Sequence, residues 1–329
     1  MNTERIEKDD GRLDLSLYMT KVINKLSEDK RYPAVHTYTS TLHSFAKFSC
    51  GAMPVNDVFT PGRLKAYEDW LLQRRLSWNT ISTYMRTLQA VYNRLSPPGT
   101  PEHNPRLFDD VYTKVKSQIK RALTEEQMGR LMHADLDVLS EELQRVQAYF
   151  LLMFLFRGMP FIDLAHLRKR DVKDGKIAYR RHKTGKQITL RIPREALPLL
   201  KEFKDKDETS LYLFPILNAA PEGDEALYEC YQKALRNFNK MLRVLAKRLL
   251  SGIKISSYTA RHTWATLACH IGMPIGIICQ ALGHSSIRVT ETYLKPFENE
   301  KVDKANRKLI STVKKQEGRS GGCFICYKT

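Results

Sequence analysis

The chain has 329 residues, of which 42% are hydrophobic, and its 54 lysines and arginines exceed its 36 acidic residues to give a formal net charge of +18. This apolar content excludes a wholly disordered chain, and the longest apolar run, residues 148–156, is too short to span a membrane. The length suits two domains, and the charge predicts binding to nucleic acid. The alternative is a protein that is merely basic.

Residues 13–95 have the apolar spacing of helices, and we expect them to form a small helical domain. Thr60 and Pro61 predict the N-cap and first residue of one helix. Asn79 is expected to cap the next helix. Residues 1–12 are polar and charged, which argues against a signal peptide and predicts a short N-terminal tail.

A proline-rich segment separates this domain from the rest of the chain. Residues 96–105 contain four prolines and one glycine and predict a linker at 96–121. A second domain, which we expect to carry the active site, would occupy residues 122–313 and begin with a helix capped by Thr124 and Gln127. The glycine-rich residues 314–329 would form a flexible tail.

The second domain has a mixed pattern. Residues 142–157 predict a buried helix, and the alternation across residues 172–192 around Thr184-Gly185 predicts a β-hairpin. Further helices are expected at residues 227–250, 261–271 and 275–282, and an amphipathic helix at 299–313 that uses Val302, Ala305, Leu309 and Ile310. The fold class is therefore mainly α with a small β-hairpin (α+β).

The six cysteines do not have the spacing of a disulfide framework, which fits a reducing cytoplasm. Cys323 and Cys326 form one isolated C-x-x-C pair, a weak signal for a metal site. We expect neither a metal nor a cofactor.

Four residues in the second domain could together attack a phosphodiester. A tyrosine can form a covalent phosphotyrosine, and Tyr293 follows His284 by nine residues. Arg261 is expected to head an apolar helix, where its guanidinium could hold a phosphate. Lys183 lies at the tip of the expected hairpin and could deliver a proton to a leaving oxygen. Taken singly, each could be an ordinary surface residue; their order and spacing indicate a site.

These motifs resemble the tyrosine recombinase (phage integrase) family over residues 13–310. The resemblance is carried by Tyr258-Thr-Ala-Arg261-His262, by Leu282-Gly-His284-Ser-Ser, and by Tyr293. Two further segments are similar in sequence to integrases and DNA invertases of Bacteroides-type bacteria: Arg157-Gly-Met-Pro-Phe-Ile-Asp-Leu164 and Tyr179-Arg-Arg-His-Lys-Thr184. The family's fold implies a helical SAM-like core-binding domain followed by a mixed α/β catalytic domain.

The resemblance implies a role for each matched residue. Tyr293 would be the nucleophile that forms a 3′-phosphotyrosine and releases a 5′-hydroxyl. Arg261 would clamp the scissile phosphate, His284 would donate a hydrogen bond to it, and Lys183 would be the general acid. The reaction would need neither metal nor ATP.

Two positions depart from the family pattern. Tyr258 replaces a histidine three residues before Arg261, and a phenol with a pKa of about 10 is a poor base. Its neighbour His262 is expected to point elsewhere on the helix. Pro160 stands where the family has its first arginine, with Asp163 in the following acidic position. Two arginines could substitute: Arg157, one helical turn earlier if the helix continues, and Arg181, on the same strand face as Lys183.

The resemblance also implies partners. We expect a homotetramer that acts on two sites in double-stranded DNA through a Holliday junction. It would work in the cytoplasm at the nucleoid, with no membrane partner. A host DNA-bending protein could serve as an accessory factor. The stripe from Val302 to Ile310 would dock onto a neighbouring protomer. The outcome would be integration, excision or inversion. The alternatives are a catalytically weakened DNA-binding relative, because the first arginine is missing, and a type IB topoisomerase that relaxes DNA without exchanging partners.

Overall fold

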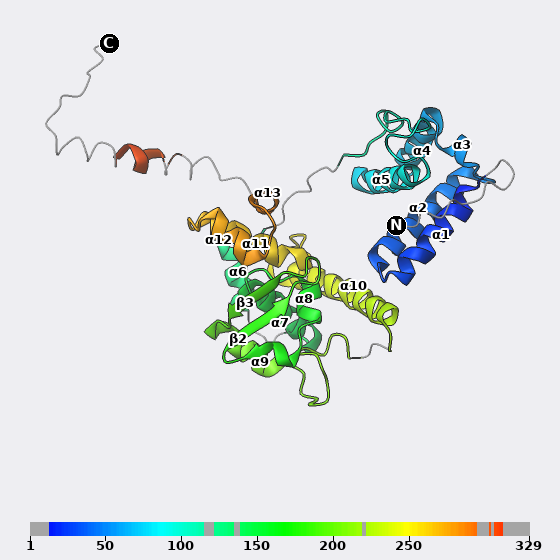
Figure 1. Cartoon of the computed structure of the whole chain (residues 1–329). Coiled ribbons are helices and arrows are strands. Elements are labelled where there is room, and N and C mark those ends of the chain that lie inside the picture. Colours follow the sequence, from blue (N-terminus) through cyan, green and yellow to red (C-terminus); the bar gives the residue numbers. More distant parts are fainter. Residues whose placement is uncertain are drawn as a thin grey trace, which may run out of the picture. The chain divides into compact units, whose positions relative to one another are not determined.

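The computed structural model describes residues 13–114, 122–134, 139–218, 222–294, 303 and 306–311. These residues form two compact units. The first contains the described residues up to Lys114 together with residues 222–229, and the second contains the remaining described residues. The helices and the small sheet confirm the expected α+β class (Figure 1). No helix within the described ranges is long and apolar enough to cross a membrane.

The first unit is a helical module, as predicted. Its helices are α1 (Leu15–Glu28), α2 (Tyr32–Ser49), α3 (Val55–Val58), α4 (Pro61–Gln73) and α5 (Trp78–Leu95). Thr60 caps α4 by accepting from the Arg63 N–H at 3.3 Å, with Pro61 as the first helical residue, as expected. The expected cap of α5 is wrong: Ser77 is the cap, since its hydroxyl accepts from the Thr80 N–H, and Asn79 lies inside the helix.

Large apolar side chains fill the core of this unit. Phe45, Tyr67, Leu88 and their neighbours are fully buried there. Leu107, Phe108 and Val111 also belong to this core, and Glu68 accepts from the Tyr112 N–H at 2.6 Å. The first part of the predicted linker at 96–121 is therefore packed against the helices, while its residues 115–121 lie outside the described part of the chain.

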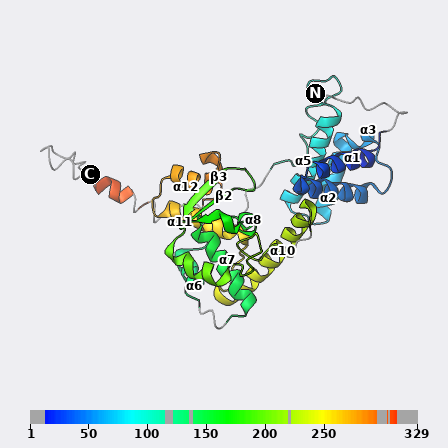
Figure 2. The same ribbon diagram turned by 60° about the horizontal axis from the view of Figure 1, so that its bottom comes forward.

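The second unit is built around the buried helix α7 (Glu141–Leu155), against which α6, α8, α9 and α11 pack (Figures 1 and 2). The surrounding helices are α6 (Glu125–Met132), α8 (Phe161–Ala165), α9 (Leu197–Phe203), α10 (Asp224–Leu249, most of which belongs to this unit), α11 (Ser257–His270), α12 (Ile275–Leu282) and α13 (Ile287–Glu291). Thr124 and Gln127 form the predicted capping box of α6.

The predicted hairpin is part of a three-stranded antiparallel sheet. The strands are β1 (Val172–Lys173), β2 (Lys176–Arg180) and β3 (Gln187–Arg191). Ile177 pairs with Leu190 and Tyr179 with Ile188, and all four side chains are buried on one face. This alternation is the reason that the segment forms strands.

Only part of the predicted last helix at 299–313 can be compared with the structure. Residue 303 and residues 306–311 are helical, and Leu309 and Ile310 are 63% and 46% exposed. Val302, Ala305, the tail at 314–329 and the cysteines Cys323 and Cys326 lie outside the described residues.

Candidate active site

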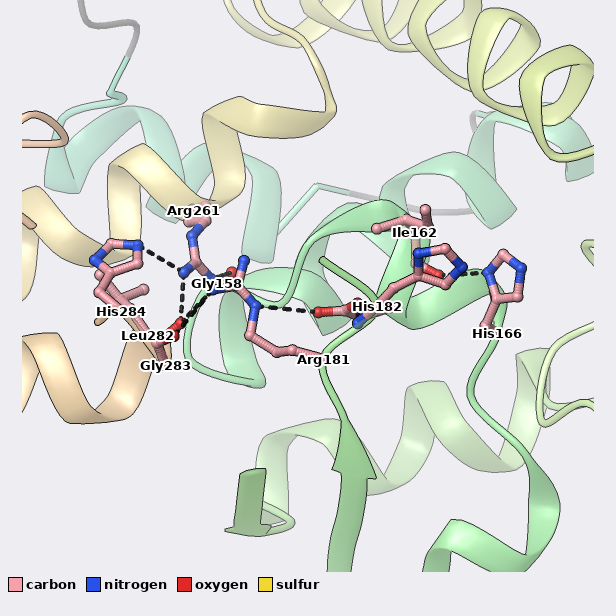
Figure 3. Close-up of polar contacts among 10 residues, drawn as sticks. Gly158, Ile162, His166, Arg181, His182, Arg261, Leu282, Gly283 and His284 are labelled. Carbon is pink, nitrogen blue, oxygen red and sulfur yellow. Dashed lines mark hydrogen bonds and ion pairs between the residues drawn. The ribbon is translucent and has the colours of Figure 1, made fainter. Parts of the chain in front are cut away.

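Two buried arginines converge on one carbonyl oxygen of the second unit. Arg261 is 2% exposed and donates from Nη2 to Leu282 O at 2.6 Å. Arg181 is 5% exposed and donates from Nη1 to the same oxygen at 3.1 Å and to Gly283 O at 3.3 Å. Figure 3 shows both guanidinium groups directed toward the Leu282–Gly283 turn. Burial and the nearby Arg181 cation lower the pKa of Arg261.

Glycines permit this close approach. Gly158 has a φ of +69°, and a Cβ there would lie 3.0 Å from Arg261 Cα. Its carbonyl accepts from Arg261 Nη1 at 2.8 Å. Gly283 ends α12 with a φ of +67°, and a Cβ there would lie 2.6 Å from Ile188 Cδ1 on β3. Glycine adopts such left-handed conformations without steric penalty, so both turns can contact the arginine pair.

Asp163 on α8 is the carboxylate beside this pair. It is 3% exposed, and its Oδ2 lies 3.6 Å from Arg181 Nε, within ion-pair range but beyond hydrogen-bond length. Its Oδ1 accepts from the His182 N–H at 2.9 Å. Burial raises the pKa of Asp163, although the His182 hydrogen bond and the Arg181 charge oppose this shift. Asp163 therefore fixes the start of the hairpin turn to α8.

His182 and His166 extend this contact. Their rings lie 4.8 Å apart between centroids, and His166 Nδ1 lies 2.9 Å from Ile162 O (Figure 3). A carbonyl only accepts, so His166 carries its proton on Nδ1. Burial lowers the pKa of His166.

His284 completes the arginine cluster on the side of α12. Its Nε2 lies 2.9 Å from Arg261 Nη2, its Nδ1 lies 2.9 Å from Thr290 Oγ1, and it is 6% exposed. Burial, followed by the charges of Arg261 and Arg181, lowers the pKa of His284 to about 4. At neutral pH the imidazole is therefore uncharged.

Tyr293 follows Thr292, the C-cap residue of α13, and its ring packs among other aromatic groups. The ring centroids of His284 and His262 are 4.8 and 4.9 Å away, and the guanidinium carbon of Arg261 is 5.6 Å from the Tyr293 centroid. Tyr258 stacks at 6.3 Å. Burial, followed by the Tyr293 charge and a hydrogen bond to that residue, raises the pKa of Tyr258, which keeps its phenol protonated near neutral pH and unavailable as a base.

The structure thus brings together five of the seven candidate residues, namely Arg181, Tyr258, Arg261, His284 and Tyr293. Lys183 lies in the turn at the tip of the hairpin, as expected, and is exposed. Arg157 does not follow the expected geometry. Helix α7 ends at Leu155, so Arg157 does not continue it and instead has a φ of +58°. Within the described ranges, it makes none of the bonds that tie Arg181 and Arg261 to the Leu282 turn.

Three local expectations were wrong. Arg261 does not head its helix, because α11 begins at Ser257, where Thr259 Oγ1 accepts from the Ser256 N–H. Arg181 and Lys183 do not share a strand face, because β2 ends at Arg180 and the turn begins there.

The third concerns His262, which does not point away from the site. It packs against the Tyr293 ring, and its Nδ1 lies 3.3 Å from Tyr293 O.

Sequence reasoning missed several supporting groups. Thr266 Oγ1 lies 3.5 Å from Tyr293 O, close to the His262 contact. His262 and Thr266 are four residues apart and therefore lie on one face of α11. This spacing could have indicated from the sequence that both contact the same neighbouring segment. No sequence pattern could have identified the backbone carbonyls of Gly158 and Leu282 as acceptors for the arginines. In the part of the chain that the structure describes, no cluster of three or more His, Cys, Asp or Glu side chains could hold a metal ion.

Comparison with known proteins identifies the family of the chain. Residues 121–300 match the phage integrase family, and residues 14–95 match the phage integrase SAM-like domain. The chain belongs to the phage integrase family. This confirms the expected resemblance, and as a member of the family the protein is a tyrosine-type site-specific DNA recombinase.

The similarities extend over most of the chain. Tyrosine recombinase XerA of Pyrococcus furiosus is 27% identical over 246 residues, which cover 72% of this chain and 79% of the relative. The Tn1549 transposon integrase in complex with transposon right end DNA is 14% identical with a TM-score of 0.64, covering 91% of this chain and 100% of that one. A lambda integrase tetramer bound to a Holliday junction is 14% identical with a TM-score of 0.57, covering 87% and 78%. At this identity, the solved structures show a shared fold.

Proposed function

We propose that this recombinase cuts double-stranded DNA with Tyr293 as the nucleophile and with Arg261 and Arg181 as the clamp on the scissile phosphate. The observation that carries the proposal is the arginine pair converging on Leu282 O beside the Tyr293 ring. Two buried cations with one neighbouring carboxylate, Asp163, leave an excess of positive charge, which is unfavourable unless an anion binds. A phosphodiester supplies that anion.

Arg181, rather than Arg157, takes the role of the family's first arginine. Asp163 occupies the acidic position of the family motif, and it pairs with Arg181 Nε at 3.6 Å. The nitrogens Arg181 Nε and Arg261 Nε have no hydrogen-bond acceptor among the described residues. Guanidinium N–H groups match phosphate oxygens in geometry, which supports the arginine pair as the clamp on the non-bridging oxygens.

The chemistry conserves the energy of the phosphodiester bond. Tyr293 Oη attacks the phosphorus and loses its phenol proton to water, a Tyr293 O–P bond forms, and the P–O5′ bond breaks. Lys183 gives a proton to the departing 5′ oxygen, which is a general-acid role suited to an exposed lysine in the turn at the tip of the hairpin. In the second half, the 5′-hydroxyl of the partner duplex attacks the phosphotyrosine and gives its proton to Lys183. A new P–O5′ bond forms, the Tyr293 O–P bond breaks, and the phenolate takes up a proton from water.

Tyr258 and His284 assist without acting as bases. The raised pKa of Tyr258 suits it to hold the attacking phenol by a hydrogen bond rather than to remove its proton. His284 lies against Arg261 at 2.9 Å, where it can donate to a phosphate oxygen once a proton is on Nε2.

Recombination requires two duplexes and therefore several protomers. We propose a homotetramer on two DNA sites, which the shared fold with a lambda integrase tetramer bound to a Holliday junction supports. Because the substrate is cellular or mobile-element DNA, we propose that the enzyme works in the cytoplasm at the nucleoid. A host DNA-bending protein would assist assembly.

The decisive experiment is a suicide-substrate assay with a nicked duplex that carries the end of the mobile element. The wild-type protein is expected to form a covalent adduct, and Tyr293→Phe none. Tyr258→Phe is the comparison variant: its ring lies 6.3 Å from Tyr293, and because it removes a positioning hydroxyl but not the nucleophile, it is expected to form the adduct at a reduced rate. An adduct that persists in Tyr293→Phe would refute the proposal.

A second substrate tests Lys183. In a duplex with sulfur in place of the bridging 5′ oxygen, the leaving thiolate needs no proton, because a thiol has a pKa near 8.5. Lys183→Ala is expected to cleave ordinary DNA slowly and the sulfur-containing duplex at nearly the wild-type rate. Equal defects on both substrates would reject the general-acid role.

A further inference from the structure

His284 is held between two buried groups that determine where its proton lies. Arg261 Nη2 is 2.9 Å from His284 Nε2, and a guanidinium can only donate. His284 Nε2 is therefore an acceptor, and the proton of the neutral imidazole is on Nδ1. From there it donates to Thr290 Oγ1 at 2.9 Å, and Thr290 is fully buried.

Phosphate binding requires the opposite arrangement. A phosphate oxygen only accepts, so His284 can donate to a phosphate beside Arg261 only from a protonated Nε2. One route is uptake of a second proton to form an imidazolium. Burial opposes that route, and so do the cations that face His284, which are Arg261 on α11 and Arg181, Lys183 and Lys186 on the hairpin.

The other route keeps His284 neutral and depends on Thr290. A threonine hydroxyl accepts and donates equally well. When Nδ1 loses its proton to water and Nε2 gains one from water, the Thr290 hydroxyl can rotate and donate to Nδ1. The imidazole carries one proton throughout, Thr290 keeps its own, and neither ring nitrogen is left buried without a partner.

We propose that Thr290 is a positioning residue that lets His284 change tautomer when the scissile phosphate enters; the proposal rests on the proposed function. Thr290 also supports the nucleophile, because its carbonyl accepts from the Tyr293 N–H at 2.9 Å. One residue therefore links the phosphate-binding histidine to the turn that presents Tyr293.

Nitrogen-15 NMR of histidine-labelled full-length protein measures the tautomer directly. In the free protein, His284 is expected to show the Nδ1–H pattern; a His284→Asn spectrum identifies its signals. In Tyr293→Phe bound to the duplex that carries the element's end, the pattern is expected to change to neutral Nε2–H. Retention of Nδ1–H, or a doubly protonated ring, would overturn the proposal.

Variants of Thr290 supply a second measurement. Thr290→Val has the same shape without the hydroxyl and is expected to slow adduct formation roughly 10²-fold at saturating DNA. Thr290→Ser is expected to restore the rate to within a few-fold. A valine variant as fast as the wild type, or a serine variant as slow as valine, would count against the proposal. Equal thermal melting of the two variants separates this effect from loss of folding.

The two proposals fail in different ways. If Tyr293→Phe still forms the adduct, the proposed function is wrong whatever His284 does. If Tyr293→Phe forms none but serine fails to rescue Thr290, only the role of Thr290 is wrong.

Discussion

Among the described residues, the first unit buries one charged side chain, Glu68, which is paired with Lys65, whereas the second unit buries two arginines side by side at its candidate active site. Phe45, Tyr67 and Leu88 are fully buried in the helical module. In the second unit Arg181 and Arg261 are almost as inaccessible, at 5% and 2% exposed. Apolar burial stabilises a fold, but a buried cation destabilises it unless it has partners. The difference indicates that the first unit is built for stability and the second retains a costly feature for function.

The largest effect is expected from the arginine pair. Arg181→Ala and Arg261→Ala should each lower the rate of adduct formation roughly 10³-fold, because each removes fixed donors that stabilise charge in the transition state. Arg157→Ala is the matched control and should change the rate only a few-fold, since Arg157 lies outside the cluster around Leu282 O. The measurement is single-turnover cleavage of the nicked duplex at saturating protein.

A larger loss of rate in Arg157→Ala than in Arg181→Ala would show that Arg181 does not take the role of the family's first arginine. Full activity of Arg181→Ala together with a large loss in Arg157→Ala would mean that the site rearranges on DNA.

In the first unit the largest effect should be on stability. Leu88 on α5 is fully buried, and Leu88→Ala is expected to lower the free energy of unfolding of that unit by about 2–5 kcal/mol. Leu17→Ala on α1 is the control, because Leu17 is 67% exposed. Hydrogen exchange read by mass spectrometry should become faster across α1–α5 and stay unchanged in α11. Faster exchange in α11 would show that the two units unfold together.

The same contrast explains what the sequence could predict. Periodicity located the helices of the first unit and the hairpin, because apolar burial repeats with the period of the backbone. The motifs around Arg261, His284 and Tyr293 identified the chemistry. Neither signal could choose between Arg157 and Arg181, because that choice depends on where α7 and β2 end.

Contacts between distant segments were also beyond prediction. His262 was expected to point elsewhere, yet it packs on Tyr293, which lies 31 residues later. The carbonyl of Leu282 serves both arginines, and a backbone oxygen leaves no trace in the sequence. Such contacts depend on the tertiary packing of α11, α12 and the hairpin.

Acid should destabilise the second unit through His284. Its pKa is about 4 in the folded chain, against about 6.5 for an unperturbed histidine. Between these values the unfolded chain binds the proton and the folded chain does not, so stability is fully present above pH 6.5 and falls as the pH approaches 4. The loss is about 3 kcal/mol at about 1.4 kcal/mol per pKa unit.

The difference in unfolding free energy between the wild type and His284→Asn isolates this contribution, since the other titrating groups are common to both proteins. This difference should depend on pH between about 4 and 6.5. A constant difference across that range would mean that His284 is charged in the folded protein.

The smallest effect should come from the turn that supports Arg261. Gly158→Ala combines a φ of +69° with a Cβ 3.0 Å from Arg261 Cα, and backbone atoms cannot move aside as a flexible side chain can. We expect the second unit to lose about 2 kcal/mol of stability and the cleavage rate to fall as Gly158 O moves relative to Arg261 Nη1. Gly276→Ala on α12 is the control, because a Cβ there meets nothing within 4 Å and alanine favours the helix. Loss of stability without loss of rate in Gly158→Ala would mean that the arginine holds its geometry independently of this turn, and that the carbonyl of Leu282 alone is sufficient to orient it.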